Sequence, residues 1–485
     1  MTPALSLPLR IMREWETIVL VYFVVVNSLY AVLLVSAGAS MRSHLHKLWH
    51  ESRERLLGSE VAPRISVLAP AYNEEFTVVE SVRALLTLSY PNLEVVLIND
   101  GSPDDTVGVL DREFDLVPIH PIFRRQVESA PVRGLYRSRI KPELLVVEKE
   151  NGGKADALNA GLNVATGDLV CTIDADTLID PDGLLRMVRP FLERDDVVAA
   201  GGMIRAANGS VVRGGRVVAP GAPRKLLPGV QVVEYLRAFL FGRLGWNRLG
   251  GNLIISGAFG LFERESVIQA GGYLHETVGE DMELVVRMRR RGIEQKGPSR
   301  VDFIPDPVAW TEVPESLRVL GRQRDRWQRG LADVLWRHRR ILGNPRYGAM
   351  GLVVFPYFML VELLGPVIEA LGLVGLFVAL GLGAVDFSFA LLFFLVAYGY
   401  GLVLSAATLL LEDFGARRYE GVSDRLIMLP WVVVESLGYR QLTVVWRLRG
   451  LFRYLRGRSD WGAMTRTGFA GSESSSSGAV RKFGV

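Results

Sequence analysis

The amino-acid sequence predicts an α/β domain carried between membrane-spanning helices, and two patterns support this prediction. Uncharged apolar runs long enough to cross a bilayer stand on either side of the middle of the chain. The middle itself, residues 64–307, alternates short β-rich runs with helical patterns, as parallel strands joined by crossover helices do. A hydrophobic content of 49% fits this combination, because it is too high for a disordered chain and high for a wholly soluble one.

Composition excludes several other classes of protein. The 485 residues include 56 Lys+Arg and 52 Asp+Glu, so the formal net charge is only +4. We therefore expect no strongly basic nucleic-acid-binding face and no nucleic acid among the partners. The single cysteine, Cys171, excludes an intramolecular disulfide framework and a multi-cysteine metal site. Cytoplasmic chemistry is permitted, and a disulfide-stapled secreted scaffold is not.

The first apolar run predicts a transmembrane helix over residues 17–40, after a short segment of residues 1–16. The run holds no charge and has about the 20 residues that a hydrocarbon core requires. The alternative is a secretory signal peptide, because the small residues at 37–39 resemble a cleavage site. We prefer the membrane helix, since the apolar stretch is longer than that of a signal peptide and the acidic Glu14 precedes it.

The C-terminal third of the chain predicts further membrane contact. Residues 348–411 form an apolar block whose length suits two transmembrane helices. Residues 425–455 carry Pro430 and several charges inside an apolar pattern, which is typical of an interfacial or re-entrant helix. Residues 456–469 follow as a candidate gating segment. The low-complexity residues 470–485 predict a disordered tail.

Charge predicts the orientation of these spans. Basic residues cluster after the first span and before the second apolar block, and both clusters flank the middle domain. By the positive-inside rule, we expect a multi-pass protein of the cell membrane whose middle domain is cytoplasmic. Glu362 and Glu369 fall within the second block, where carboxylates are costly, so we expect them to face protein or a polar path rather than lipid. Interfacial depth is the alternative for both.

Polar residues follow each of four predicted strands, at residues 65–69, 93–98, 144–147 and 169–173. In open α/β sheets, ligands bind beyond the carboxyl ends of the strands. The candidate ligand-binding residues at these ends are, in chain order, Tyr72 and Glu74, Asp100, Lys154, and Asp174 with Asp176.

Lys154 and the pair Asp174 and Asp176 give the most specific indications of chemistry. Asp174 and Asp176 are two residues apart after a buried strand, so both carboxylates point the same way and can reach one hard cation. An isolated Asp-x-Asp also occurs in turns and caps. Lys154 follows two glycines and begins a helical pattern, which favours an anionic phosphate. A P-loop is excluded, because Glu148 and Ala155 occupy the places of its glycine and hydroxyl residue.

Three further features remain ambiguous on local grounds. Asp100 can accept a hydrogen bond from a base or a ribose, or can serve as a cap or turn residue. Glu280 and Asp281 begin an amphipathic helical pattern, and the local pattern alone favours capping. The basic helical stretch around Gln323 and Trp327 can instead be a juxtamembrane segment attracted to anionic lipid.

Taken in order, these residues resemble the D, DxD, ED and QxxRW motifs of the membrane-embedded family 2 glycosyltransferases, which include the synthases of cellulose, hyaluronan, chitin and poly-N-acetylglucosamine. The resemblance covers about residues 61–330. It implies a GT-A fold for residues 61–310, inserted between transmembrane helices in an integral membrane protein. Residues 311–347 would form interfacial helices. The matching residues are Asp100, Asp174, Asp176, Glu280, Asp281, Gln323, Arg326 and Trp327.

The resemblance also implies roles for the donor site. The uridine of a UDP-sugar would be held by Tyr72, Glu74 and Asp100. Lys154 would lie near the ribose or the phosphates. Mg²⁺ or Mn²⁺ bound through Asp174 and Asp176 would neutralise the departing diphosphate.

On the acceptor side, Asp281 would be the general base that takes a proton from the attacking hydroxyl, with inversion at the anomeric carbon. Glu280 would position the acceptor or the base. Three residues would border the acceptor site: Gln323, Arg326 and Trp327. Trp461 and Arg466 resemble a gating loop that closes over the nucleotide, and an interfacial tryptophan anchor with a basic partner is the alternative.

The leading hypothesis is an inverting, metal-dependent hexosyltransferase that elongates a β-linked polysaccharide from a UDP-sugar at the cytoplasmic membrane face, coupled to export. The alternative is a non-processive enzyme that adds one sugar to a lipid or short acceptor. A third hypothesis is a non-enzymatic, membrane-anchored binding module. It is disfavoured, because Asp281 and Trp327 would have no function in such a protein. Expected partners are the donor, the growing glycan and the lipid bilayer. The small membrane part also suggests an accessory subunit or a homo-oligomer, and residues 105–144 form an insertion without an assigned catalytic role.

Overall fold

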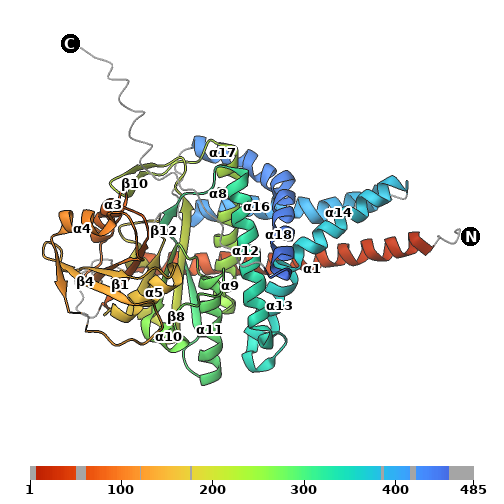
Figure 1. The fold of residues 1–485 in the computed structure, drawn as a ribbon. Coiled ribbons are helices and arrows are strands. Elements are labelled where there is room, and N and C mark those ends of the chain that lie inside the picture. The colour runs from red at the N-terminus through yellow and green to blue at the C-terminus, as the bar shows by residue number, and fades with distance from the viewer. Residues whose placement is uncertain are drawn as a thin grey trace, which may run out of the picture.

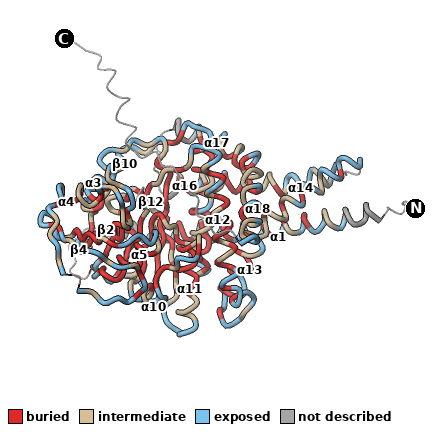
Figure 2. Tube along the Cα trace, in the orientation of Figure 1, coloured by how far each residue is buried: buried red, intermediate tan, exposed pale blue. Residues whose placement is uncertain are grey.

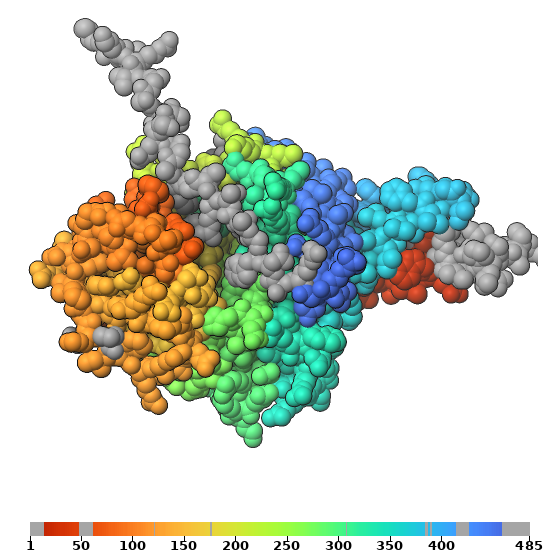
Figure 3. Space-filling view, viewed as in Figure 1, coloured from red at the N-terminus to blue at the C-terminus, as the bar shows by residue number. Residues whose placement is uncertain are grey.

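A computed structural model of the chain describes residues 7–50, 62–120, 122–174, 177–383, 387–415 and 422–457. Figure 1 shows an α/β domain on one side and a group of long helices on the other, with α1 (Leu7–His50) running along both. In the space-filling view, the strand-bearing middle of the chain and the C-terminal helices form adjoining masses (Figure 3).

A mixed sheet organises the α/β domain. Within the described residues it has ten strands in the order β3-β4-β5-β2-β1-β6-β11-β8-β12-β7. Their bounds are β1 Ile65–Ala71, β2 Leu93–Asn99, β3 Leu116–Ile119, β4 Val132–Ser138, β5 Leu144–Lys149, β6 Leu169–Ile173, β7 Leu178–Ile179, β8 Val197–Ala206, β11 Phe259–Glu263 and β12 Arg300–Thr311. A separate antiparallel pair consists of β9 (Val211–Arg213) and β10 (Arg216–Ala219).

The four strands predicted from the sequence are confirmed, and they form the parallel centre of the sheet. β1 pairs in parallel with β2 and β6, and β2 pairs in parallel with β5. Their runs of Val, Ile and Leu are buried on both faces, as parallel strands between helical layers require. Because the strands are parallel, their carboxyl ends, with the polar residues that follow them, meet at one edge.

Helices cover both faces of this sheet. Their bounds are α3 Val78–Leu86, α4 Thr106–Phe114, α5 Lys154–Val164, α6 Gly183–Met187, α7 Arg189–Glu193, α10 Arg264–Ala270 and α11 Glu280–Gln295. The apolar side chains of α3 and α6 belong to one core cluster, and those of α5, α10 and α11 belong to another. Figure 2 shows the resulting concentration of buried residues in the sheet.

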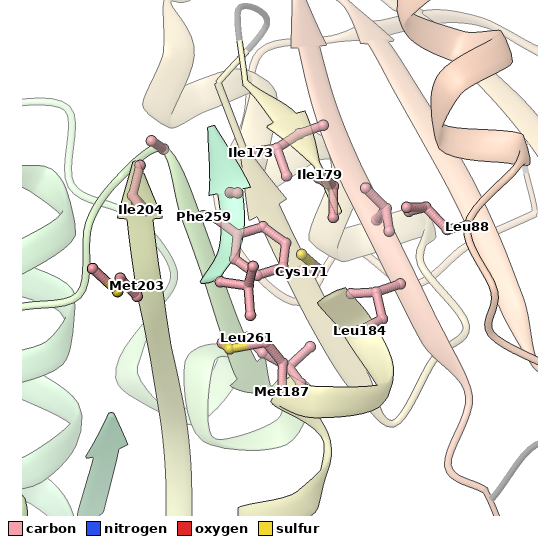
Figure 4. Packing of buried hydrophobic residues seen from close by; sticks show 14 of the residues in the cluster. Leu88, Cys171, Ile173, Ile179, Leu184, Met187, Met203, Ile204, Phe259 and Leu261 are labelled. Carbon is pink, nitrogen blue, oxygen red and sulfur yellow. The ribbon is translucent and has the colours of Figure 1, made fainter. Parts of the chain in front are cut away.

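Cys171 lies in the first of these clusters. Its side chain is fully buried in β6, and Leu261 of the antiparallel strand β11 is its cross-strand partner. Leu184 and Met187 of α6 pack in the same cluster (Figure 4). The lone cysteine is therefore a small core residue beside the strand end that carries Asp174.

The stretch at residues 105–144, which carried no assigned role, extends the sheet. It contains α4, β3 and β4, and β4 pairs antiparallel with both β3 and β5. These residues form the outer edge of the sheet, away from β6.

The remaining helices make up the second layer of the molecule. Their bounds are α8 Leu226–Leu236, η1 Arg237–Arg243, α9 Leu244–Leu249, α12 Leu317–Arg337, η2 Arg339–Ile341, η3 Pro345–Tyr347, η4 Met350–Val354, α13 Phe355–Tyr357, η5 Phe358–Leu363, α14 Gly365–Gly381, α15 Phe387–Phe394, η6 Leu395–Gly399, α16 Tyr400–Gly415, α17 Val422–Val434, η7 Glu435–Tyr439 and α18 Arg440–Leu455.

Two helical stretches are long and apolar enough to cross a bilayer, Glu14–Lys47 and Ala390–Asp413. A third span results if Met350–Leu363 and Gly365–Gly381, which meet at a bend of 42°, act together. These stretches coincide with the apolar runs predicted as spans. α14 and the N-terminal half of α1 project together from the body and expose apolar side chains (Figures 1 and 2).

The segment predicted as an interfacial or re-entrant helix consists of α17 and α18. Non-helical backbone angles at Leu437 and Gly438 separate the two, and Gly438 has a φ of +119° that favours glycine. α18 packs along α12. The gating segment beyond residue 457, with Trp461 and Arg466, and the predicted tail lie outside the described residues, as does Asp176.

Candidate functional site

A large cavity lies where the α/β domain meets the helices. Its volume is about 1000 Å³. The lining at the domain end includes Lys154, Asp174, Gly257, Glu280, Asp281, Gln323, Arg326 and Trp327. The lining at the helical end includes Tyr22, Asn27, Tyr30, Glu362, Glu369, Arg440 and Arg447. One cavity thus connects the predicted reaction site with the predicted membrane helices, and both acidic residues of the second apolar block face it, as expected.

Lys154 and Asp174 meet at the domain end of the cavity. Asp174 directly follows β6, and Lys154 is the first residue of α5. The Lys154 ammonium forms an ion pair with Asp174 and lies 3.4 Å from the carbonyl oxygen of Gly257. Gly153, just before the lysine, has a φ of +85°, so the turn that delivers Lys154 requires glycine.

Asp281 is held at the start of α11 by two backbone groups. The N–H of Gly257 donates to Oδ2 at 3.0 Å, and the N–H of Met282 donates to Oδ1 at 2.8 Å. The N-cap of α11 is Gly279, and Asp281 satisfies a first-turn N–H while its other oxygen reaches across to Gly257. The positive end of the helix dipole favours a carboxylate here.

Glu280 has a different environment from its neighbour. It is only 8% exposed. Burial, followed by the charge of Asp281, raises the pKa of Glu280, and Lys154 works against this shift.

Negative charge is in excess around Lys154. Burial alone would lower the pKa of this ammonium, but the carboxylate of Asp174 and then that of Glu280 hold it above the ordinary value. A carboxylate that already binds a cationic group has the donor chemistry of a Mg²⁺ or Mn²⁺ ligand, so Asp174 fits the predicted metal. Within the described residues, no three His, Cys, Asp or Glu side chains cluster closely enough to hold a metal ion.

Asp100 supports the turn before Lys154. It is 4% exposed, and its two oxygens accept hydrogen bonds from the N–H groups of Gly152 at 3.0 Å and Gly153 at 2.7 Å. It also pairs with the fully buried Lys149, which lies 2.6 Å from Asp156. Sequence reasoning missed Lys149, because lysine is almost never fully buried. The predicted contact of Asp100 with a nucleotide stays a prediction.

Tyr72 and Glu74 follow β1, next to the end of β2. Ala71 pairs with Asn99 in the register of the two strands, so these side chains and Asp100 lie at adjacent strand ends. The Tyr72 side chain is exposed, and the backbone N–H of Glu74 donates to Thr106 Oγ1 at 3.2 Å. Tyr72, Glu74 and Asp100 are not among the described residues that line the cavity, so the structure brings together only part of the predicted site.

α12 presents Gln323, Arg326 and Trp327 to the cavity. The Trp327 ring is 46% exposed and lies 4.2 Å from the guanidinium carbon of Arg324. Arg324 is buried and forms an ion pair with Glu234 of α8 at 2.5 Å. Arg324 therefore fixes the tryptophan, a role that the sequence does not reveal because its partner lies 90 residues away.

Two glycines bring α12 against the start of α11. A Cβ atom on Gly330 would stand 3.0 Å from the Cα atom of Gly279. The contact is between backbones, which cannot give way as a flexible side chain can. It places the helix start that carries Asp281 beside the turn of α12 that carries Trp327.

Two models of known protein families match the sequence of this chain. The profile described as Glycosyl transferase family 2 matches residues 66–268, and the profile described as Glycosyl transferase family group 2 matches residues 169–404. The two matches together span residues 66–404, which include nearly all of the sheet, the domain end of the cavity and part of the helical layer.

Similar curated proteins include the poly-beta-1,6-N-acetyl-D-glucosamine synthases of Staphylococcus aureus (strain COL) and Staphylococcus epidermidis. This chain is 28% identical to the first over 274 residues and 28% identical to the second over 273 residues. The matched region covers 56% of this chain and 56% of each relative, so the chain spans little more than half the length of the relatives it matches.

Among solved structures, the mannosyltransferase PcManGT from Pyrobaculum calidifontis, in complex with GDP-Man and Mn²⁺, has a TM-score of 0.50 to this chain. The two are 20% identical, and the match covers 89% of this chain and 99% of that one. At this identity the likeness shows the fold, and it supports the GT-A fold expected from the sequence.

Proposed function

We propose that this chain, which belongs to glycosyl transferase family 2, elongates a β-linked polysaccharide from a UDP-sugar at the cytoplasmic face of a membrane. The observation that carries the proposal is the single cavity that runs from Asp174 and Asp281 to the apolar helices. The names of the curated relatives support N-acetylglucosamine as the transferred sugar.

Asp281 is suited to the role of general base. Two backbone N–H groups fix the orientation of its carboxylate, and the carboxylate lines the cavity. As the acceptor oxygen bonds to the anomeric carbon, its proton passes to Asp281 and the bond from that carbon to the diphosphate oxygen breaks. UDP leaves, and the configuration inverts from α to β.

Lys154 is suited to stabilise the departing diphosphate. Its ammonium lies at the N-terminus of α5, where the helix dipole also favours an anion. Asp174, with Asp176, would hold a divalent cation. Such a cation, when bound, supplies Lewis-acid stabilisation to the same charge. The Mn²⁺ complex of the fold neighbour supports this choice of cofactor.

Trp327 is suited to bind the terminal sugar of the acceptor. Arg324 holds the indole from one side, and the ring remains nearly half exposed in the cavity wall. Aromatic faces pack well against the C–H faces of sugars because both are apolar and flat.

The helical end of the cavity fits a neutral glycan on its way out of the site. Glu369 and Arg440 form an ion pair at 3.2 Å, and Arg447 lies 3.6 Å from Glu362. The phenol of Tyr22 and the amide of Asn27 face the same space. These walls offer paired charges, donors and acceptors, which suits the hydroxyl groups of a sugar and supports the coupling of synthesis to export.

The test is incubation of the purified protein in lipid nanodiscs with a panel of UDP-sugars and Mg²⁺ or Mn²⁺. We expect release of UDP with a product of high molecular weight, and the largest yield from UDP-N-acetylglucosamine. A product with a single added sugar would favour the non-processive alternative. No turnover with any donor would contradict the proposal.

The Asp281→Asn variant tests the base. We expect it to lower transfer by about 10³-fold, within the usual range of general base catalysis, while the Kd for UDP stays within about twofold. The control is Asp115→Asn, which alters an exposed ion pair with Arg139 and should leave transfer unchanged. Near-normal activity of Asp281→Asn would remove the base assignment.

A further inference from the structure

Arg243 occupies an unusual position in the cavity wall. It is the last residue of η1, and it lines the cavity near the domain end. Its guanidinium carbon lies 4.5 Å from the centre of the Phe239 ring. Its Nη1 atom is buried and has no hydrogen-bond partner among the described residues.

Five other cationic side chains that line the cavity are paired with carboxylates. The pairs are Lys154 with Asp174, Arg237 with Glu435, Arg324 with Glu234, Arg440 with Glu369 and Arg447 with Glu362. For Arg243, no carboxylate of the described residues lies within ion-pair distance. A buried guanidinium donor left without a partner costs free energy, and a bound ligand with an acceptor oxygen would recover it.

Arg243 lies on the side of the base: it lines the same cavity as Asp281, and Phe241 of η1 belongs to one core cluster with Met282, the residue after Asp281. Burial lowers the pKa of its guanidinium to about 10, and the largest opposing influence is the negative charge of Asp281. A ligand oxygen bound by Arg243 therefore lies near Asp281, where the acceptor hydroxyl must be.

The balance of charges that line the cavity indicates which kind of ligand Arg243 binds. Among the described lining residues, eight carboxylates face seven cationic side chains. Such a wall does not attract an anionic lipid phosphate, whereas a neutral sugar can use both its donors and its acceptors. The stacked Phe239 ring adds a flat apolar surface next to the guanidinium.

We propose that Arg243 binds the acceptor: its guanidinium donates a hydrogen bond to a hydroxyl or amide oxygen of the terminal acceptor sugar and so holds the attacking hydroxyl against Asp281. This proposal rests on the proposed function and adds the residue that orients the acceptor for that reaction. The Phe239 ring, 4.5 Å from the guanidinium carbon, packs against the guanidinium and supports it in the cavity wall.

The test measures acceptor binding separately from turnover. The probe is a β-1,6-linked N-acetylglucosamine tetrasaccharide, titrated into the full-length protein in nanodiscs with UDP present, and binding is followed by calorimetry. We expect Arg243→Met to raise the Kd of the tetrasaccharide by about tenfold to a hundredfold, as the loss of a hydrogen bond to a charged group does. Arg243→Lys should recover part of this loss, because the charge returns without the planar fork.

Two controls separate a binding role from a folding role. The Kd for UDP and the melting temperature of Arg243→Met should match those of the unaltered protein. Arg194→Met, which alters a surface ion pair with Asp196 at 2.8 Å outside the cavity lining, should leave the tetrasaccharide Kd unchanged.

The outcomes distinguish this proposal from the proposed function. Three results with Arg243→Met would each overturn the acceptor role. The first is a tetrasaccharide Kd equal to that of the unaltered protein. The second is weaker binding of UDP instead of the tetrasaccharide, and the third is a selective loss of binding to polyprenyl phosphate. Loss of tetrasaccharide binding supports that role even if no UDP-sugar is turned over, a result that would contradict the proposed function alone. Failure of the unaltered protein to bind the tetrasaccharide would overturn the assignment to a sugar acceptor of this class.

Discussion

At the scale of single residues, the start of α11 separates two adjacent carboxyl groups by their surroundings. Asp281 accepts two backbone hydrogen bonds and faces the cavity, whereas Glu280 is buried and has a raised pKa. The two neighbouring acids thus have different surroundings, which is consistent with the proposal that Asp281 acts as the base while Glu280 shapes its environment.

The raised pKa of Glu280 predicts how stability depends on pH. Stability from the protonated group is fully present below its ordinary pKa of 4.5 and is lost as pH rises through the raised value. The Glu280→Gln variant cannot ionise, so we expect it to melt at a higher temperature than the unaltered protein at pH 8, with the difference shrinking towards pH 4.

Thermal unfolding across this pH range is the measurement. The control is Glu276→Gln, at a side chain that is 83% exposed, and it should show no such pH-dependent difference. A lower melting temperature for Glu280→Gln at pH 8 would mean that the ionised form of Glu280 is stabilising.

At the scale of elements, the contact between α11 and α12 sets the relation between the base and the tryptophan. Gly279 and Gly330 let the two backbones approach more closely than any side chain would permit. The sequence places both glycines next to motif residues but does not show that they touch, because 51 positions separate Gly279 from Gly330 along the chain.

The Gly330→Ala variant tests this contact. Its Cβ would stand 3.0 Å from the Gly279 Cα, so we expect a loss of about 1–3 kcal/mol in stability from overpacking. Transfer should fall by at least about tenfold, because a shift of about 1 Å in a reacting group is enough to cost about 10²-fold. Gly297→Ala is the matched control, since nothing lies within 4 Å of a Cβ there. Equal activity of the two variants would contradict the positioning role.

At the scale of the whole molecule, one cavity joins the α/β domain to the apolar helices, and the orientation of the chain follows from its proposed use. Under the proposed function, the domain end would meet cytoplasmic UDP-sugars, and the projecting helices α1 and α14 would lie in lipid (Figure 1). The native chain is well suited to a labelling test, because its single cysteine is fully buried and burial raises the pKa of the Cys171 thiol.

We expect the Ile140→Cys variant, on the α/β domain, to react with a membrane-impermeant maleimide in inverted vesicles and not in intact spheroplasts. The Val374→Cys variant, on α14, should react in neither, although the two native side chains are equally exposed at 59% and 58%. Labelling of Ile140→Cys in spheroplasts would reverse the orientation. Labelling of Val374→Cys in either preparation would show that α14 does not lie in the bilayer.

The sequence by itself determined the parallel centre of the fold and the chemistry at its edge. Short runs of apolar, β-branched residues report burial locally, so β1, β2, β5 and β6 were predictable, and the polar residues that follow each run are visible in the sequence. The spaced motifs also indicated the family. The predicted roles of Tyr72, Glu74 and Asp100 with the nucleotide follow from the family resemblance and stay predictions.

Only the tertiary structure decided which groups meet. Lys149 with Asp100, Arg324 with Glu234 and the unpaired Arg243 in the cavity wall depend on elements far apart in sequence. Local periodicity does not reveal such contacts, because a charged residue that is paired in the core and a charged residue that is solvated look the same in a sequence. The continuity of the cavity has the same origin: it is a space between elements, and its shape exists only after they pack.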